Sequence, residues 1–208
     1  MNRQRSRNRN WRGAAAALVL GPVLALTGCR NTSRVQSLEY ETASWAVPLD
    51  EPGLPNFHKV SAELYRGAQP TVEGLIYLRE LGVATVVSAR ADDRTRELAS
   101  QAHLRYEHIP MSSWQVQDDQ VVRFLRLFNQ NGHEPVFVHC QHGADRTGVL
   151  CAMYRVVIQG WSKSQAIDEM CRGGMGFHSM CENLARYVQQ TDIESIRRAA
   201  GLGDSVNP

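Results

Sequence analysis

Cysteine is scarce in this chain, and its cysteines stand far apart. The 208 residues contain five, and no two of them have the CxxC spacing that is typical of zinc-binding proteins. The sequence therefore gives no reason to expect a metal site. The five are Cys29, Cys140, Cys151, Cys171 and Cys181.

An excess of charge of one sign is also lacking. The formal net charge is +2, which is too small to indicate a nucleic-acid partner. The first 12 residues hold five arginines and no acidic residue, so the remainder is neutral to slightly acidic. Hydrophobic residues make up 43% and charged residues 21%, which is ordinary for a globular protein. Length and composition predict one domain with tails.

A hydrophobic run long enough to cross a membrane is absent as well. The longest run, residues 13–26, is shorter than the ~20 residues that a spanning helix needs. It follows the basic segment and leads into Leu26, Thr27, Gly28 and Cys29. This ending resembles the bacterial lipobox, in which small residues precede a cysteine that receives lipid and becomes the mature N-terminus. The resemblance implies a lipoprotein signal peptide over residues 1–28.

Cys29 would then be the lipidation site. The protein would be exported and lipid-anchored to a bacterial membrane, on its periplasmic or cell-surface side. An ordinary signal peptide, or an uncleaved anchor with a chance cysteine, is the alternative interpretation.

The rest of the chain divides by composition. Residues 29–55 are polar and then rich in proline and glycine, which predicts a linker. Residues 56–198 alternate apolar runs with amphipathic segments, which predicts an α/β domain with a central mixed or parallel sheet flanked by helices. Residues 199–208 are expected to form a tail, with fraying from about Ile196.

Individual elements can be placed within that domain. Apolar and β-branched runs predict strands over residues 83–89, 104–110 and 135–139. Helical periodicity follows Thr71 and Ser162, both suited to capping a helix N-terminus. Further helices are expected over residues 96–102, 121–128, 147–159 and 176–190.

Residues 139–148, HCQHGADRTG, lie between a predicted strand and a predicted helix. Cys140 precedes Arg146 by six positions, and Gly143 lies between them. Five intervening residues are enough for a semicircle whose backbone N–H groups point inward and hold a dianionic oxyanion. The N-terminus of the following helix adds positive potential. The stretch therefore predicts a phosphate-binding loop.

The side chains of this loop suit nucleophilic attack on phosphorus. A positive environment favours the thiolate of Cys140, and the fork of Arg146 can hold two phosphate oxygens. The hydroxyl of Thr147 can donate a hydrogen bond to the sulfur. The expected substrate-binding residues are Gln141, His142, Gly143, Ala144 and Thr147.

At these positions the sequence resembles the cysteine-based protein tyrosine and dual specificity phosphatases, whose loop reads His-Cys, five residues, Arg, then Thr or Ser. His139, Cys140 and Arg146 stand at the family's positions. The resemblance covers residues 56–190 and implies the small phosphatase fold. It implies hydrolysis of phosphate monoesters through a phosphocysteine, with neither metal nor cofactor, because Arg146 and the loop amides supply the positive charge. Arg66, in a stretch typical of a subset of these enzymes, either supports the loop or is a surface or buttressing arginine.

The sequence leaves open which residue is the general acid that protonates the leaving group. Most relatives carry an aspartate where this chain has Ser113. Asp145 gives the loop an Asp-Arg-Thr ending that resembles myotubularin-like and Sac-type lipid phosphatases, in which the loop aspartate is the proposed acid. Repulsion from the phosphate dianion favours a proton on such a carboxyl group, which can then protonate the leaving oxygen. Asp118 or Asp119 is an alternative acid, although both suit the start of a helix, and so is a reaction with no protein acid.

The substrate class is open too. The loop lacks the lysines seen where highly charged inositol lipids are preferred, which favours phosphorylated proteins or small phosphomonoesters. The Asp-Arg-Thr ending favours inositol phosphates or phospholipids instead. Two further classes remain: a pseudophosphatase that binds phosphorylated ligands without turnover, and a sulfur transferase of the rhodanese type, whose loops are usually shorter.

The remaining cysteines and a cluster of arginines each have two possible roles. Cys151 falls in an apolar run and is expected in the core, whereas Cys171 and Cys181 could pair if the protein is exported. Arg90, Arg94 and Arg96 either bind an anionic substrate or belong to a solvated charged loop.

Overall fold

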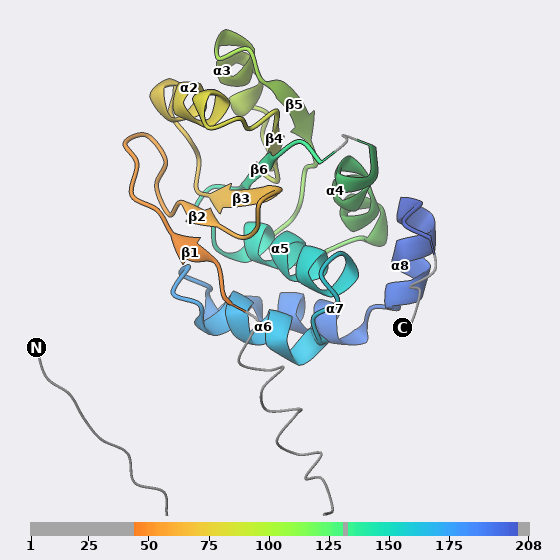
Figure 1. Cartoon of the computed structure of the whole chain (residues 1–208). Helices are drawn as coiled ribbons and strands as arrows, with labels where there is room; N and C mark the ends of the chain where they lie inside the picture. The colour runs from red at the N-terminus through yellow and green to blue at the C-terminus, as the bar shows by residue number, and fades with distance from the viewer. Residues whose placement is uncertain (1–43, 131–132, 204–208) are drawn as a thin grey trace, which may run out of the picture. The chain divides into compact units, whose positions relative to one another are not determined.

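The computed structural model describes residues 44–130 and 133–203 and arranges them around a six-stranded mixed sheet (Figure 1). The strand order is β1-β2-β3-β6-β4-β5. The parallel strands are β3 (Leu64–Gly67), β6 (Val136–His139), β4 (Thr85–Ser88) and β5 (Arg105–His108). Two antiparallel strands, β1 (Val47–Pro48) and β2 (His58–Lys59), extend the β3 edge. The expected α/β fold with a mixed sheet is confirmed.

The strands β3, β4 and β6 are buried along their whole length. Successive side chains of a strand point to opposite faces of the sheet, so each face needs its own apolar layer. In β6, Phe137 packs into one apolar cluster, whereas Val136 and Val138 pack into another. Both faces are therefore covered, as is usual for parallel strands.

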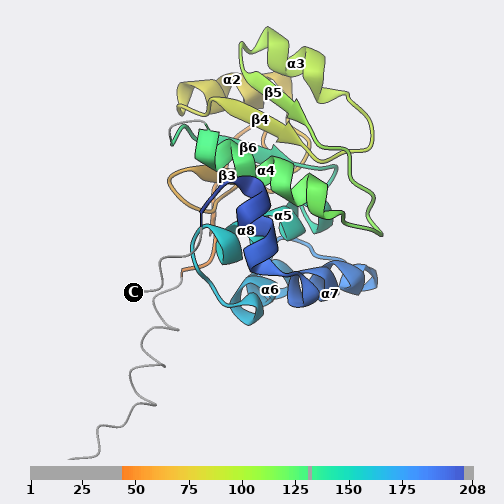
Figure 2. The same ribbon diagram turned by 90° about the vertical axis from the view of Figure 1, so that its right-hand side faces the viewer.

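Helices lie on the two faces of this sheet (Figures 1 and 2). On one face are α2 (Val72–Glu80) and α3 (Thr95–Gln101). On the other are α4 (Asp118–Gln130), α5 (Asp145–Val157), α6 (Lys163–Arg172), α7 (Glu182–Gln190) and α8 (Ile193–Ala200). None of the helices in residues 44–130 and 133–203 is long and apolar enough to span a bilayer.

Two helix starts have the caps that the sequence predicts. The Thr71 side chain accepts a hydrogen bond from the Gly74 amide at the start of α2. Ser162 forms a reciprocal capping box with Gln165 at the start of α6. The start of each of these helices is therefore determined by hydrogen bonds of its own cap residue.

The expected linker over residues 29–55 is wrong in its last part, because residues 44–55 belong to the domain. β1 pairs with β2, and Ala46 and Leu54 are buried. The prolines that suggested a linker lie at an edge strand and in turns, where a missing N–H is tolerated. The expected signal peptide, Cys29 and the rest of the linker lie outside the described residues.

The expected fraying from Ile196 and the domain end at residue 198 are also wrong. Asp192 caps α8, and Ile196 and Ala200 are buried. Gly201 ends the helix with a φ of +74°, and Leu202 packs against the core. Residues 204–208 of the expected tail lie outside the described residues.

The carboxyl ends of the parallel strands all meet at one edge of the sheet. Gln69 follows β3, Arg90 follows β4, Met111 follows β5 and Cys140 follows β6. Sites of open α/β sheets form at this edge, because the loops after neighbouring parallel strands converge there.

Candidate active site

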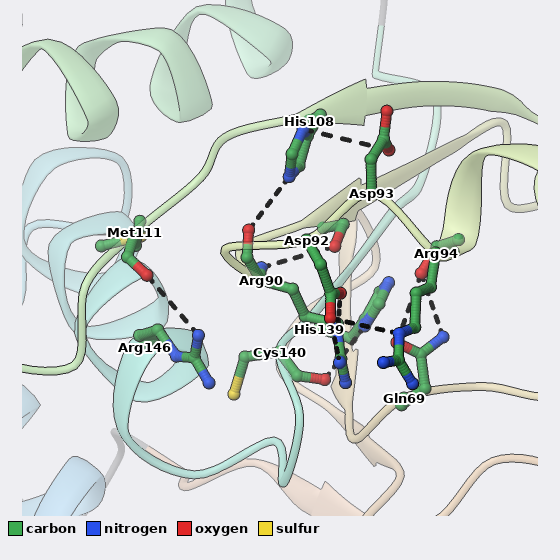
Figure 3. A network of polar contacts seen from close by, with 12 residues as sticks. Gln69, Arg90, Asp92, Asp93, Arg94, His108, Met111, His139, Cys140 and Arg146 are labelled. Atoms are coloured by element: carbon green, nitrogen blue, oxygen red, sulfur yellow. Dashed lines mark hydrogen bonds and ion pairs between the residues drawn. The ribbon is translucent and has the colours of Figure 1, made fainter.

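The loop between Cys140 and Arg146 connects β6 to α5 at this edge of the sheet. Figure 3 shows the Cys140 sulfur beside the Arg146 guanidinium, with Arg90 and Met111 nearby from two other loops. Cys140 is 2% exposed, and α5 begins at Asp145. The predicted strand, loop and helix therefore bring the thiol and the arginine together.

Gly143 gives the loop its tight bend. Its φ is +71°, and a Cβ there would lie 2.5 Å from the carbonyl carbon and oxygen of Gly67. A side chain at this position would meet both backbone strain and a clash with rigid backbone. The close approach joins the loop to the chain that leaves β3, where the Gln69 amide also donates to the Gln141 carbonyl oxygen (3.3 Å).

Arg66 holds the loop from beneath. It is 1% exposed, and its Nη2 donates to the carbonyl oxygens of Gly143 (2.6 Å) and Ala144 (3.3 Å). The N–H and C=O of a trans peptide unit point in opposite directions. Carbonyls drawn toward Arg66 therefore leave the neighbouring amides pointing away from it. Arg66 is a buried residue in contact with the loop, not a surface arginine.

The surroundings of Cys140 favour its thiolate. Burial raises the pKa of this thiol, but hydrogen bonds from the Thr147 hydroxyl and amide, together with the charge of Arg146, outweigh burial and lower the pKa below its ordinary value. The buried Thr147 hydroxyl has no nitrogen or oxygen partner within the described residues, so it is available to the sulfur. Cys151, fully buried on α5, differs: burial raises the pKa of that thiol to about 11.

His139 is a buried neutral imidazole. Burial lowers the pKa of this side chain to about 4. Its Nδ1 lies 3.1 Å from the Cys140 carbonyl oxygen, and since a carbonyl only accepts, Nδ1 donates. His139 thus holds the backbone at the nucleophile rather than taking part as an acid.

Arg90 lies at the mouth of the same site. With Ala91, Asp92, Gln141 and Arg146 it lines a pocket of about 400 Å³. The guanidinium forms a two-point ion pair with Asp92, at 2.7 and 2.8 Å (Figure 3). This hydrogen bonding lowers the pKa of Asp92 to about 2.

Arg90, Arg94 and Arg96 are close in sequence but differ in their surroundings. Arg94 and Arg96 are exposed and ion-paired with Asp92 and Asp93, as expected of a solvated loop. Of the three, Arg90 is the nearest to the end of the buried strand β4, two positions after Ser88, and this position distinguishes it in the sequence.

The loop after β5, which carries Ser113, reaches the site through its backbone. The Met111 carbonyl oxygen accepts a 3.5 Å hydrogen bond from Arg146 Nη1. Ser113 is half-buried, and its neighbour Trp114 is 62% exposed. Asp118 and Asp119 lie in the first turn of α4, where negative charge stabilises a helix. Asp118 also accepts a 2.7 Å hydrogen bond from the Tyr187 hydroxyl.

Asp145 is engaged by a residue that the sequence did not suggest. Its carboxylate accepts a 2.9 Å hydrogen bond from the His178 backbone N–H and lies 2.8 Å from His178 Nδ1. His178 follows the glycine-rich turn after α6, 33 positions along the chain. No local pattern connects the two residues, so only the packing of that turn on the loop reveals the pair.

A second pocket, of about 310 Å³, lies beside the loop. It is lined by Asn56, His142, Ala144, Gly174, Met175, Gly176 and His178. The Asn56 side-chain amide bridges its two sides by donating to the carbonyl oxygens of His142 (2.9 Å) and Met175 (3.0 Å). The glycine-rich turn is therefore fixed against the phosphate-binding loop.

Two other expectations concern cysteine and metal. Cys151 is buried in the core, and Cys171 is a free thiol, while the Cys181 side chain lies outside what the structure describes. Across residues 44–130 and 133–203, no group of three or more His, Cys, Asp or Glu side chains is placed to hold a metal ion.

Comparison with known proteins gives consistent matches. A family model described as "DSP-PTPase phosphatase fused to NAD+ Kinase" matches residues 50–188. The dual specificity protein phosphatase TpbA of Pseudomonas aeruginosa (strain UCBPP-PA14) is 36% identical over 195 residues, which cover 93% of this chain and 87% of that protein. An inositol diphosphatase of Arabidopsis thaliana is 28% identical over 128 residues, or 55% of this chain and 60% of its own length.

A solved structure is similar over most of the domain. The crystal structure of a P. aeruginosa TpbA variant in complex with pTyr has a TM-score of 0.68 and 36% identity. The match covers 78% of this chain and 99% of that one.

Proposed function

The chain belongs to the cysteine-based protein tyrosine and dual specificity phosphatases, and we propose that it dephosphorylates phosphotyrosine in proteins. The chain is a phosphatase that hydrolyses phosphate monoesters. One observation identifies Cys140 as the nucleophile. The pKa of its thiol is lowered by the Thr147 hydroxyl and by the Arg146 guanidinium.

The reaction has two steps. The Cys140 thiolate attacks phosphorus while Arg146 and the amides of residues 141–147 hold the other phosphate oxygens. The leaving oxygen departs with a proton, and a phosphocysteine forms. Water then releases phosphate and regenerates the thiolate. Arg66 supports both steps, because it turns the loop carbonyls away from the substrate.

Asp145 is our choice for the general acid. It immediately precedes Arg146, and the usual acid position holds Ser113. Asp118 is bound instead to Tyr187 at the start of α4, where its charge stabilises the helix. Asp119 shares that first turn, so neither is our choice for the acid.

The substrate proposal rests on two observations. The TpbA variant, at 36% identity, was crystallised with pTyr. The loop residues Gln141, His142 and Ala144 include no lysine that would favour highly charged substrates. An inositol phosphate or phospholipid is the second candidate, which Arg90 could contact in the 400 Å³ pocket with Arg146 if it left its ion pair with Asp92.

A substrate panel tests the proposal. Phosphotyrosine and phosphoserine peptides, inositol phosphates and phosphoinositide vesicles are compared by phosphate release, for the wild type and for Cys140→Ser. We expect the highest kcat/KM with phosphotyrosine peptides and no turnover in Cys140→Ser. A preference for inositol phosphates would favour the second candidate. A wild type no faster than Cys140→Ser on every member would make the chain a phospho-ligand-binding pseudophosphatase.

We also propose that Cys29 is lipidated and anchors the protein to a bacterial membrane outside the cytoplasm. The support is the basic segment, the short apolar run and the lipobox-like ending of the first 29 residues. Labelling with a radioactive fatty acid should mark the wild type and not Cys29→Ser, and the variant should move from the membrane to the soluble fraction. An unlabelled wild type would rule out the anchor.

A further inference from the structure

His178 lies against the carboxylate that precedes the phosphate-binding arginine. Its backbone N–H contacts one oxygen of Asp145 at 2.9 Å, and its ring Nδ1 contacts the other at 2.8 Å. The Asp145 side chain is only 13% exposed, whereas that of His178 is 50% exposed. The carboxylate is therefore shielded by a residue that remains open to solvent.

The ring of His178 has two sides with different surroundings. When the pair carries one proton more than a carboxylate and a neutral imidazole, that labile proton lies between Nδ1 and Asp145 while the ring keeps its Nε2–H. The residue also lines the 310 Å³ pocket beside the loop. The imidazole is therefore in contact with Asp145 on one side and half-exposed to solvent.

We propose that Asp145 and His178 form a proton-carrying pair, in which Asp145 protonates the leaving oxygen and His178 is the positioning residue that orients and reloads it. The inference rests on the proposed function and names the partner that its general acid requires. It also explains why position 113 holds a serine and not an aspartate, because the loop after β5 does not need to supply an acid.

The proton balance of the cycle closes through this pair. In the first step the sulfur–phosphorus bond forms and the bond to the leaving oxygen breaks. The pair gives its one labile proton to that oxygen and is left as a carboxylate and a neutral imidazole. In the second step water attacks the phosphocysteine and gives one proton back to the pair, so that phosphate and the Cys140 thiolate are released.

His178 packs against ionisable side chains of the phosphate-binding loop and of α5. From the phosphate-binding loop, the His142 ring lies 6.1 Å away between centroids. From α5, Asp145 faces it directly, and Arg146 is the next residue on that helix. The neighbouring lining residues of the glycine-rich turn, Met175 and Gly176, carry no charge.

A purely structural role for His178 is the competing explanation, since it also fastens the glycine-rich turn to the start of α5. Two substitutions separate the explanations. His178→Gln keeps a side-chain donor for the Asp145 carboxylate but has no proton that titrates, whereas His178→Ala keeps neither.

The test compares a phosphate ester with a poor leaving group, phenyl phosphate, and one with a good leaving group, a fluorinated umbelliferyl phosphate. Because an acid assists mainly poor leaving groups, we expect kcat on phenyl phosphate to fall about tenfold or more in Asp145→Asn, His178→Ala and His178→Gln. On the activated ester all three should stay within about threefold of the wild type. The pH profile of kcat on phenyl phosphate should differ from that of the wild type in both His178 variants.

The matched control is another histidine–carboxylate pair at the opposite end of the strands. His133 Nδ1 lies 2.6 Å from Glu63, before β6 and β3 begin, and His133→Gln should change neither substrate's kcat. Wild-type activity of His178→Gln on phenyl phosphate, or equal losses on both esters, would assign His178 a structural role and overturn the pair. A wild type no faster than Cys140→Ser on either ester would instead refute the phosphatase function on which the pair rests.

Discussion

The Arg66 guanidinium donates a 2.6 Å hydrogen bond to the carbonyl oxygen of Gly143 and so joins strand β3 to the phosphate-binding loop. The two residues are 77 positions apart in the sequence. Arg66 is one of the largest fully buried side chains in the described part of the chain. The contact couples the stability of the domain to the shape of its active site.

Loss of the Arg66 side chain should affect both stability and catalysis. In Arg66→Ala the buried carbonyls of Gly143 and Ala144 lose their donor, so we expect the free energy of unfolding to fall by about 2–3 kcal/mol. We expect kcat/KM on an aryl phosphate to fall at least about tenfold, because the loop amides lose their fixed orientation. Urea unfolding and steady-state kinetics measure the two effects. An Arg66→Ala enzyme with wild-type kinetics would show that the loop holds its shape unaided.

Gly143→Ala should abolish the bend of the loop. The new Cβ would lie 2.5 Å from the Gly67 backbone at a φ of +71°. Gly82→Ala is the control, because Gly82 has a φ of +91° but open space around its Cβ position. We expect about 1 kcal/mol of destabilisation from strain alone in the control. Gly143→Ala should lose clearly more stability, together with phosphatase activity; equal stability of the two variants would argue against the clash.

Alkylation of Cys140 should follow the pKa of its thiolate. Since that pKa is lowered, the rate of modification by iodoacetamide should reach half its maximum at a lower pH than the rate for a free cysteine. Thr147→Val removes the hydroxyl and should move the midpoint upward. Cys151 serves as an internal control: burial raises the pKa of that thiol to about 11, and it should stay unmodified in the folded protein. A Cys140 midpoint at or above the ordinary value would contradict the electrostatic argument.

The sign of the stability effect follows from the same shift. A group whose folded pKa is depressed contributes stability that is fully present above its unfolded pKa and is lost as the pH falls through its folded pKa. The wild type should therefore gain stability relative to Cys140→Ser as the pH rises through that interval. Urea unfolding of both proteins across the interval gives the difference.

Removal of one partner of the Arg155–Glu169 pair should be costly. Two contacts, of 2.8 and 2.6 Å, join side chains that are each 3% exposed, and Glu169 also accepts from the Ala46 amide. Glu169→Ala leaves a buried guanidinium without its carboxylate partner, so we expect a loss of about 3–5 kcal/mol in urea unfolding. The surface pair Arg123–Glu107 is the control, with an expected effect of about 0–1 kcal/mol for Glu107→Ala. Similar losses in both variants would contradict the role assigned to burial.

Much of the fold was predictable, because its signals are local. A helix cap depends on residues three positions away, as at Thr71 and Ser162. A buried strand is visible as a short apolar run, as in β4 and β6. The errors arose where pairing across the molecule decides. The two-residue strand β1 exists because it pairs with β2, and α8 is ordered because Ile196 and Ala200 are buried against the rest of the domain. Neither partner is visible in a local window of sequence.

By itself, the sequence determined the nucleophile, the phosphate-binding arginine and the loop between them, because Cys140 and Arg146 are six positions apart and a short loop brings them together whatever surrounds it. Only the tertiary structure decided which distant residues complete the site. Arg66 reaches Gly143 because β3 pairs with β6, Arg90 arrives at the end of β4, and His178 meets Asp145 because the turn after α6 packs on the loop. Those contacts depend on strand order and helix packing, which the residues of the motif do not encode.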